Sequence, residues 1–197
     1  MKVLGINGSP KRNGFTARLL DSALEGSQSA GAHTERVDIC GLDIKPCDEC
    51  DGCARDGKCV IHDDMDMLAG KVREADAVIV ASPVFFTTIT AQLKAMIDRF
   101  QDAWISKYLL NSDRWSDKKR AGFFICVSGY DRKEFFENSR MVAKAFFLTL
   151  NINYAGDLFF GPTNGMAEGD KRGVFAINDA RGCGEALVEK LKEITHE

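Results

Sequence analysis

Hydrophobic residues along the chain fall into two kinds of stretch. Short runs of strand length, several of them almost continuously apolar, predict strands at residues 2–6, 34–39, 75–83, 120–129 and 154–160. Longer stretches with apolar positions every three or four residues predict helices from residue 16 to the AGAH tetrapeptide and at 63–75, 90–100, 134–150 and 178–194. This alternation predicts a parallel sheet with helices on both faces.

Five strands in this order favour a flavodoxin-like, doubly wound α/β fold with strand order 2-1-3-4-5. We expect one domain over residues 1–197, with a cysteine loop inserted at 45–65, after the second strand. Ligands of such sheets bind beyond the carboxyl ends of the strands, near the switch point between strands 1 and 3. Residues 102–119 follow no simple period, which leaves a lid, an interface loop or a plain connection open.

Composition narrows the range of partners. The net charge is −3 with both signs interspersed, which argues against nucleic acid or an anionic membrane as the main partner. No apolar run approaches the roughly 18 residues of a membrane span, and the start of the chain is broken too early for a signal peptide. We therefore expect a cytoplasmic protein, a setting in which clustered cysteines are ligands or redox groups more often than disulfides.

The loop after the first strand, GSPKRNGFT, opens a helix and is rich in groups that hold phosphate. Its glycines allow close approach, its hydroxyls and cations favour an anion, and the helix start adds free N–H groups. It is not a Walker A loop, and a phosphate site at a flavodoxin-like switch point indicates FMN. The alternative is an ordinary polar turn capped by Ser9 or Asn13. The candidate residues are Ser9, Lys11, Asn13, Phe15 and Thr16.

The loop after the third strand, ASPVFFTTITAQLK, offers a surface for a planar ring. Pro83 fixes the turn, and apolar side chains and backbone groups follow it, as an isoalloxazine requires. The alternative is that the phenylalanines are core residues that finish a buried strand. The candidates are Ser82, Pro83, Val84, Phe85 and Phe86. Ser128, Gly129 and Tyr130, after the fourth strand, are placed to complete the pocket or to form a plain turn.

Four cysteines follow the spacing C-x2-C-x2-C-x5-C. A three-residue period brings successive thiols to one side of a tightly coiled backbone, and the longer gap lets the fourth return from another direction. This suits a [4Fe–4S] cluster, whereas structural zinc usually takes two C-x2-C pairs separated by a dozen or more residues. Zinc and redox-active or vestigial thiols remain alternatives. The candidate metal ligands are Cys47, Cys50, Cys53 and Cys59.

The remaining three cysteines have simpler interpretations. We expect Cys40 and Cys126 to be core residues within strands, and Cys183 to be at most a surface thiol at a helix start. Three acidic residues next to the four-cysteine segment, Asp63, Asp64 and Asp66, would lower the potential of a cluster or simply cap a helix.

Together the three segments resemble the iron–sulfur flavoproteins of the NADPH-dependent FMN reductase superfamily. GSPKRNGFT is similar to the phosphate loop GSPRxxGNT of that family, and KPCDECDGCARDGKCVIHDDM is similar to its compact cysteine motif. SPVFFTTITAQLKAMIDR is similar to its SPVYFxxxxAQLKxxxDR segment. The resemblance covers most of the first hundred residues. Phe15 replaces the usual Asn, and Phe85 replaces the usual Tyr.

The resemblance implies FMN, a [4Fe–4S] cluster and a homodimer or homotetramer. Electrons would come from ferredoxin or NAD(P)H and pass to small acceptors such as oxygen species or quinones. No catalytic side chain is implied, because the cofactors carry the chemistry. By matching position, the resemblance assigns the phosphate to Ser9, Lys11, Asn13 and Thr16, the flavin ring to Pro83, Val84, Phe85 and Phe86, and the cluster to the four cysteines.

The sequence therefore predicts a flavin-dependent oxidoreductase that carries a [4Fe–4S] cluster and transfers electrons between ferredoxin or NAD(P)H and small acceptors. One alternative is an NAD(P)H-dependent FMN or quinone reductase without a functional cluster. Another is a non-catalytic FMN-binding redox partner or sensor. No pattern in the sequence identifies the physiological donor or acceptor.

Overall fold

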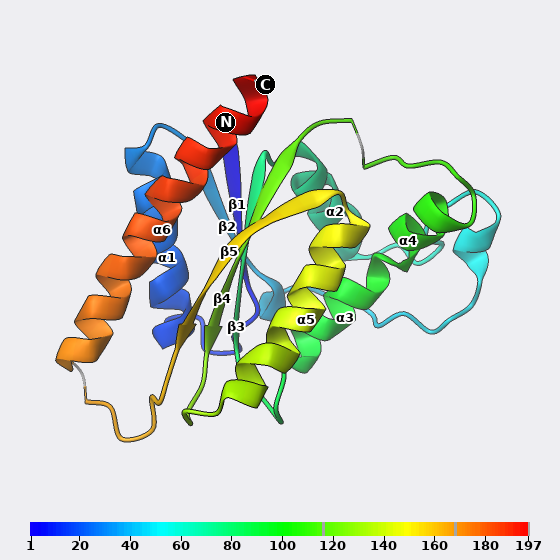
Figure 1. The fold of residues 1–197 in the computed structure, drawn as a ribbon. Helices are drawn as coiled ribbons and strands as arrows, with labels where there is room; N and C mark the ends of the chain where they lie inside the picture. The colour runs from blue at the N-terminus through cyan, green and yellow to red at the C-terminus, as the bar shows by residue number, and fades with distance from the viewer. Residues whose placement is uncertain (116, 168, 197) are drawn as a thin grey trace.

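Five parallel strands form one sheet in the predicted order β2-β1-β3-β4-β5 (Figure 1). The computed structural model describes residues 1–115, 117–167 and 169–196. All neighbouring strands pair in parallel, so their carboxyl ends share one edge of the sheet. The strands are β1 (Lys2–Asn7), β2 (His33–Asp38), β3 (Ala77–Pro83), β4 (Arg120–Val127) and β5 (Ile152–Phe160).

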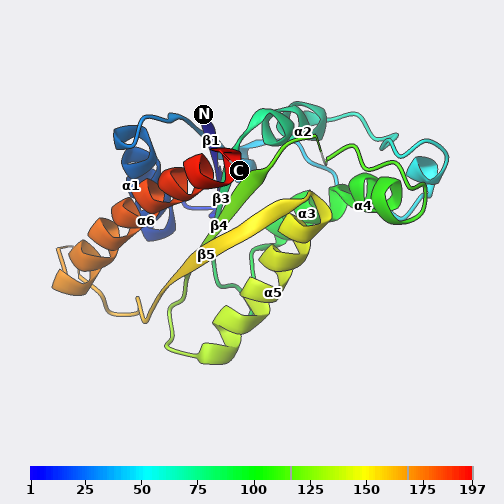
Figure 2. The same ribbon diagram turned by 45° about the horizontal axis from the view of Figure 1, so that its top comes forward.

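Helices cover both faces of the sheet, as predicted. Helices α1 (Phe15–Ser29) and α6 (Lys171–His196) lie on one face. Helices α2 (Asp64–Glu74), α3 (Ala91–Arg99) and α5 (Lys133–Thr149) lie on the other (Figures 1 and 2). This arrangement is the flavodoxin-like α/β fold.

Two helix boundaries differ from the predicted ones. Helix α4 (Gln101–Tyr108) lies largely within the stretch that showed no period; it has only eight residues, and half of them are polar. Helix α6 begins at Lys171 rather than residue 178. Its first turns bury small residues such as Ala176 and expose Val174 and Phe175, so the apolar pattern there does not follow the buried face.

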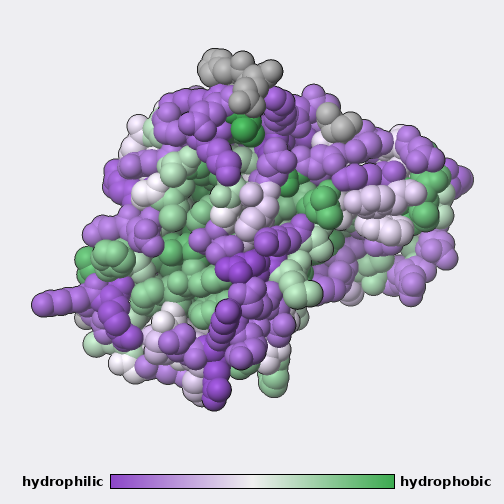
Figure 3. All heavy atoms as spheres, in the orientation of Figure 1, coloured by the Kyte–Doolittle hydropathy of each residue, from purple (hydrophilic) through white to green (hydrophobic). Residues whose placement is uncertain are grey.

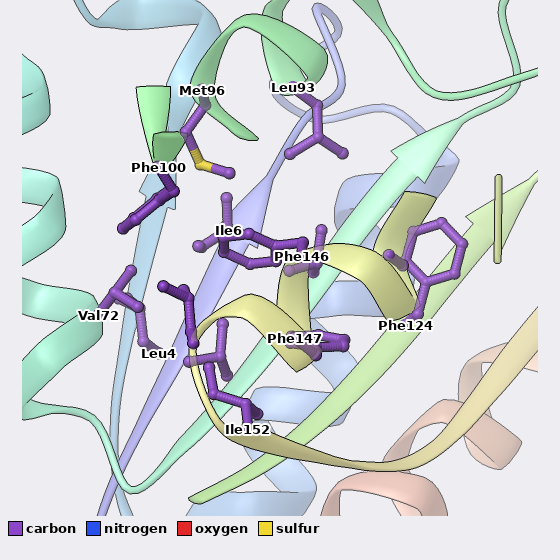
Figure 4. Packing of buried hydrophobic residues seen from close by; sticks show 14 of the residues in the cluster. Leu4, Ile6, Val72, Leu93, Met96, Phe100, Phe124, Phe146, Phe147 and Ile152 are labelled. Carbon is purple, nitrogen blue, oxygen red and sulfur yellow. The ribbon is translucent and has the colours of Figure 1, made fainter. Parts of the chain in front are cut away.

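The larger hydrophobic core lies between the sheet and helices α2, α3 and α5. Alternation along β1 points Leu4 and Ile6 to this face, where they meet Phe146 and Phe147 of α5 (Figure 4). Phe124 of β4 joins the same cluster. Each such side chain, when fully buried, contributes roughly 1.5–3 kcal/mol to folding. This core packs helices α2, α3 and α5 against the sheet.

Helices α1 and α6 pack against each other unusually closely. A β-carbon added to Gly26 would overlap the carbonyl of Arg181, and one added to Gly184 would overlap the carbonyl of Ala23. Glycine is therefore required for this approach at both positions. Cys183, expected at a helix start, lies instead in the middle of α6 and is half-buried.

Two further cysteines can now be placed. Cys126 is fully buried in β4, as predicted. Cys40 was predicted to lie in a strand, which is wrong: it lies in the short 3-10 turn η1 (Ile39–Gly41) that follows β2. Strand β5 is an edge strand of the sheet. Figure 3 shows apolar residues gathered between this strand and α6. Within the described ranges, no helix has the length and apolar character needed to cross a membrane.

Candidate cofactor cleft and cysteine segment

A cleft of about 720 Å³ opens at the carboxyl ends of the strands, which is a volume typical of small-molecule sites. Ten of the twelve predicted cofactor residues line it; Asn13 and Ser82 do not. Its lining comprises Ser9, Pro10, Lys11, Gly14, Phe15, Thr16, Pro83, Val84, Phe85, Phe86, Thr87, Val127, Ser128, Gly129, Tyr130, Phe135, Thr163 and Asn164. The fold thus brings together the three loops that the sequence singled out.

The turn after β1 builds one end of the cleft around backbone N–H groups. Asn7 Oδ1 accepts a hydrogen bond from Ser9 N at 3.1 Å, and Ser9 Oγ accepts one from Lys11 N at 3.2 Å. Gly14 N then closes the turn on Lys11 O at 3.0 Å. Helix α1 begins immediately afterwards, and no side chain in the described residues caps its first turn. This leaves a polar, amide-rich cradle suited to an anion.

The two cations of this turn have different surroundings. Lys11 lines the cleft, whereas Arg12 pairs with the carboxylate of Asp38 at 2.9 Å. Asp38 also accepts hydrogen bonds from Arg36 and Asn7. Burial alone would raise the pKa of Asp38, but these bonds more than offset it, so the pKa lies below its usual value. Lys11 is therefore the cation placed to face a bound anion.

A buried threonine connects the loop after β1 to the loop after β3. Thr90 Oγ1 donates to Gly8 O at 2.7 Å and accepts from Leu93 N at 3.3 Å, which caps helix α3. Thr90 N donates to Ser82 Oγ at 3.2 Å. Ser82 and Thr90 are both fully buried. Ser82 therefore joins β3 to the start of α3 and does not line the cleft, and its contact with the flavin stays a prediction.

The apolar rim after β3 is a tight turn in a sparsely populated conformation. Phe85 N donates to Thr88 O at 2.8 Å, and Thr88 N donates to Phe85 O at 3.2 Å. Between them Phe86 and Thr87 have φ angles of 45° and 69°. A β-branched residue in this left-handed region is strained, and such strain concentrates at functional sites. The turn leaves the Phe86 ring fully exposed at the mouth of the cleft.

The far wall joins the loops after β4 and β5. Ser128 N donates to Phe160 O at 2.9 Å, and Thr163 N donates to Ser128 O at 3.0 Å. A β-carbon on Gly129 would lie 2.7 Å from Asn164 Oδ1, so a larger residue there requires the side chain of Asn164 to move.

Sequence reasoning missed several residues of the cleft: Pro10, Thr87, Val127, Phe135, Thr163 and Asn164. A signal for the last two existed in the sequence. They belong to the polar turn GPTNG, which follows the fifth strand and so lies at the same sheet edge as the other loops.

The cysteine segment lies away from this cleft, beside helix α4 (cyan in Figures 1 and 2). Cys47 and Cys50 are exposed, Cys53 and Cys59 are half-buried, and all seven cysteines of the chain are free thiols. Glu49 and Asp51 take left-handed φ angles of 58° and 56°, which coil the backbone between the cysteines. The predicted ligands therefore share one accessible, tightly turning loop.

The donor set of this loop suits an iron–sulfur cluster in kind and number. Burial raises the pKa of the Cys53 thiol, and the charges of Asp102, Cys59 and Cys47 raise it further, so these groups interact. Within the described residues, no three histidine, cysteine or acidic side chains are grouped so as to hold one metal ion. A cluster core is larger than a single ion, so the assignment of its four ligands stays a prediction.

Comparison with known proteins places these features in context. Residues 1–143 match the family model described as NADPH-dependent FMN reductase. The chain is 34% identical over 200 residues to an iron–sulfur flavoprotein of Methanocaldococcus jannaschii, covering 98% of this chain and 99% of that protein.

Solved structures show the same fold at lower sequence identity. A flavone reductase superposes with a TM-score of 0.77 and 22% identity, covering all of this chain and 65% of the other. An NAD(P)H:quinone oxidoreductase from Methanothermobacter marburgensis superposes with a TM-score of 0.75 and 21% identity, covering 95% and 96% of the two chains.

Proposed function

Because the chain belongs to the iron–sulfur flavoproteins of the NADPH-dependent FMN reductase family, we propose that it is an electron-transfer flavoprotein with FMN in the cleft and a [4Fe–4S] cluster on the cysteine segment. One observation carries the proposal: the chain combines a cofactor-sized cleft with a separate loop of four free thiols. Either feature alone would suit a simpler protein. Together they provide two redox sites in one chain.

In this proposal the amide-rich turn and Lys11 bind the FMN phosphate at the start of α1. The strained rim of Phe85, Phe86 and Thr87 and the wall at Gly129 enclose the ring system and exclude water from it. Asn13 is exposed and does not line the cleft, and its contact with the phosphate stays a prediction. No side chain needs to act as an acid or base, because binding, orientation and desolvation are the tasks of the protein.

Cys47, Cys50, Cys53 and Cys59 would be the cluster ligands. When bound, the two cofactors supply exchange between carriers of electron pairs and carriers of single electrons. We propose ferredoxin or NAD(P)H as donors and small molecules such as quinones as acceptors. Because the cysteine segment lies to the side of the sheet and the cleft at its end, we further propose a homodimer or homotetramer that brings the segment of one subunit to the cleft of another.

Anaerobic purification followed by cofactor analysis tests the assignment of both groups. We expect about one FMN, four iron and four sulfide per chain, with a broad absorption shoulder at roughly 400–420 nm above the flavin bands. Cys50→Ala should lose iron and sulfide but keep FMN, because the two sites are separate. Cys183→Ala, a half-buried thiol on α6, is the matched control and should retain everything.

Reduction kinetics with NADH, NADPH and reduced ferredoxin then test the electron-transfer role. Zinc without sulfide in the purified protein would refute the cluster. Turnover of NAD(P)H and a quinone that is undiminished in Cys50→Ala would favour a simple reductase instead. Binding of FMN without turnover by any donor would favour a redox partner or sensor.

A further inference from the structure

Arg99, the last residue of helix α3, forms a buried ion pair below the cysteine segment. Its side chain is 1% exposed, and Nη1 lies 2.6 Å from Oδ2 of Asp63, which is 2% exposed. Charged side chains are rarely this deeply buried unless they are paired, and such a pair is weak grounds by itself for stability. The other contacts of Arg99 therefore matter more.

These contacts join the two ends of the cysteine segment. Arg99 Nη1 donates to Lys45 O at 2.9 Å, two residues before the first cysteine. Arg99 Nη2 donates to Ile61 O at 2.8 Å, two residues after the last. Asp63 Oδ2 also accepts from Lys45 N at 3.0 Å. A single guanidinium thus holds both strands of backbone that lead into and out of the four-cysteine loop.

Electrostatics couples the same guanidinium to one of the cysteines. Burial alone would lower the pKa of Arg99, but the carboxylate of Asp63 and the thiol of Cys59 more than offset this and raise it. Arg99 Nε is buried and has no hydrogen-bond partner among the residues that the structure describes. A buried N–H without an acceptor is costly, and a cysteine thiolate is an acceptor that a cation favours.

Arg120 shows what a purely structural arginine looks like in this chain. It is fully buried, pairs with Asp117 at 2.7 Å and donates to the carbonyl of Trp115, and among the described residues its Nε also has no partner. Its hydrogen-bond partners in the described part of the chain are Arg73, Trp115, Asp117 and Lys118, all outside the cysteine segment. Burial and an open Nε are therefore not specific to Arg99, whereas hydrogen bonds to both ends of the cysteine segment are.

We propose that Arg99 is a positioning residue for the iron–sulfur cluster: its guanidinium closes the base of the cysteine segment by holding the backbone on both sides of the four cysteines. The proposal rests on the cluster of the proposed function. Two consequences follow from it. The closed base holds the thiols near one another, which slows loss of the cluster. The positive charge beside a ligand stabilises the reduced, more negative cluster and so raises its reduction potential.

Two substitutions separate these consequences. Arg99→Gln removes the charge and the forked set of donors, whereas Arg99→Lys keeps the charge but not the fork. Arg120→Lys is the matched control, with equal burial and a carboxylate partner but no contact with the loop. We first measure iron and sulfide in the parent chain, then the rate at which a chelator removes iron, and then the cluster potential by redox titration.

We expect Arg99→Gln to lose iron about 10–100 times faster than the parent chain, as is typical when a group that supports a metal ligand is removed. Arg99→Lys should also lose iron faster, yet its remaining cluster should keep a potential near the parental value. The potential in Arg99→Gln should fall. Arg120→Lys should match the parent in both measurements, even if its thermal stability drops.

Hydrogen exchange on the iron-free chain provides a readout that needs no cofactor. Amides at residues 45–63 should exchange faster in Arg99→Gln than in the parent, while those of helix α5 should not change. If Arg99→Gln does not fold, amide exchange at residues 45–63 is compared between Arg99→Lys and the parent instead.

The outcomes distinguish the two proposals. A parent chain that holds FMN but neither iron nor sulfide refutes the cluster, and the positioning role fails with it. A loaded parent together with Arg99 variants that keep parental iron-release rates and potential refutes the positioning role alone, and the proposed function stands.

Discussion

Thr90→Val tests whether one buried hydroxyl couples the two loops that frame the cleft. The substitution keeps the shape of the side chain but removes the donor to Gly8 O and the acceptor for Leu93 N, which lie 2.7 and 3.3 Å away. Both loops lose a connection that water cannot replace, because Thr90 is fully buried. The turn that we assign to the phosphate should become less ordered as a result.

Two losses set the size of the effect. Removing a helix N-cap costs about 1 kcal/mol, within a range of roughly 0.5–2 kcal/mol. Leaving the buried carbonyl of Gly8 with only the weak donor Cys40 Sγ, 3.8 Å away, costs a further roughly 1–3 kcal/mol. We therefore expect the free energy of unfolding to fall by about 2–4 kcal/mol. For a chain of this size, the melting temperature should fall by roughly 5–15 °C.

Urea denaturation of the cofactor-free chain measures the loss, and Thr90→Ser is the control because it retains the hydroxyl. The control should lie within about 1 kcal/mol of the parent. Quenching of FMN fluorescence should show weaker binding in Thr90→Val than in Thr90→Ser. Equal unfolding free energies for the two variants would refute the coupling, since the serine variant keeps the hydroxyl and loses only a methyl group, whereas the valine variant lacks the hydroxyl.

Three further predictions concern reactivity, pH and the cleft wall. Burial raises the pKa of Cys126 to about 12, so alkylation near pH 8 should label exposed Cys50 of the iron-free chain long before Cys126, as mass spectrometry would show. Asp38 has a lowered pKa, so its contribution to stability is present above the unfolded-state pKa and is lost as pH falls through the folded-state pKa. Asp38→Asn should therefore melt below the parent near pH 7, with the gap closing in acid; a gap independent of pH would contradict this. Gly129→Ala should weaken FMN binding, because the new β-carbon meets Asn164, and an added Asn164→Ala should restore it; a double variant no better than the single one would assign the effect elsewhere.

Most of the fold could be predicted because the relevant signals are local. The apolar runs that became β3 and β4 are buried on both faces, and the periodic stretches became helices on either side. The misses have equally local causes. Helix α4 has only eight residues, half of them polar, and the first turns of α6 bury alanine and glycine while exposing Val174 and Phe175.

The candidate site was predictable where a loop follows a strand directly. Parallel strands bring their carboxyl ends together, so the loops with Ser9, Pro83 and Ser128 had to meet at one edge. The spacing of four cysteines likewise marked one compact loop of free thiols, whose role as ligands stays a prediction. Thr163 and Asn164 were missed because their turn carries no motif and gains its role only by packing against Gly129.

Short-range pattern therefore accounts for the strands, the polar turn after β1 and the thiol donors, since each depends on residues near one another in the chain. The connections between these parts depend on contacts that exist only after the sheet has assembled. Thr90 reaches Gly8 across two loops, and Arg99 holds Lys45 and Ile61 from the end of another helix. Nothing in the local sequence marks a buried hydroxyl or guanidinium as a link between distant segments, because its partners are supplied by packing.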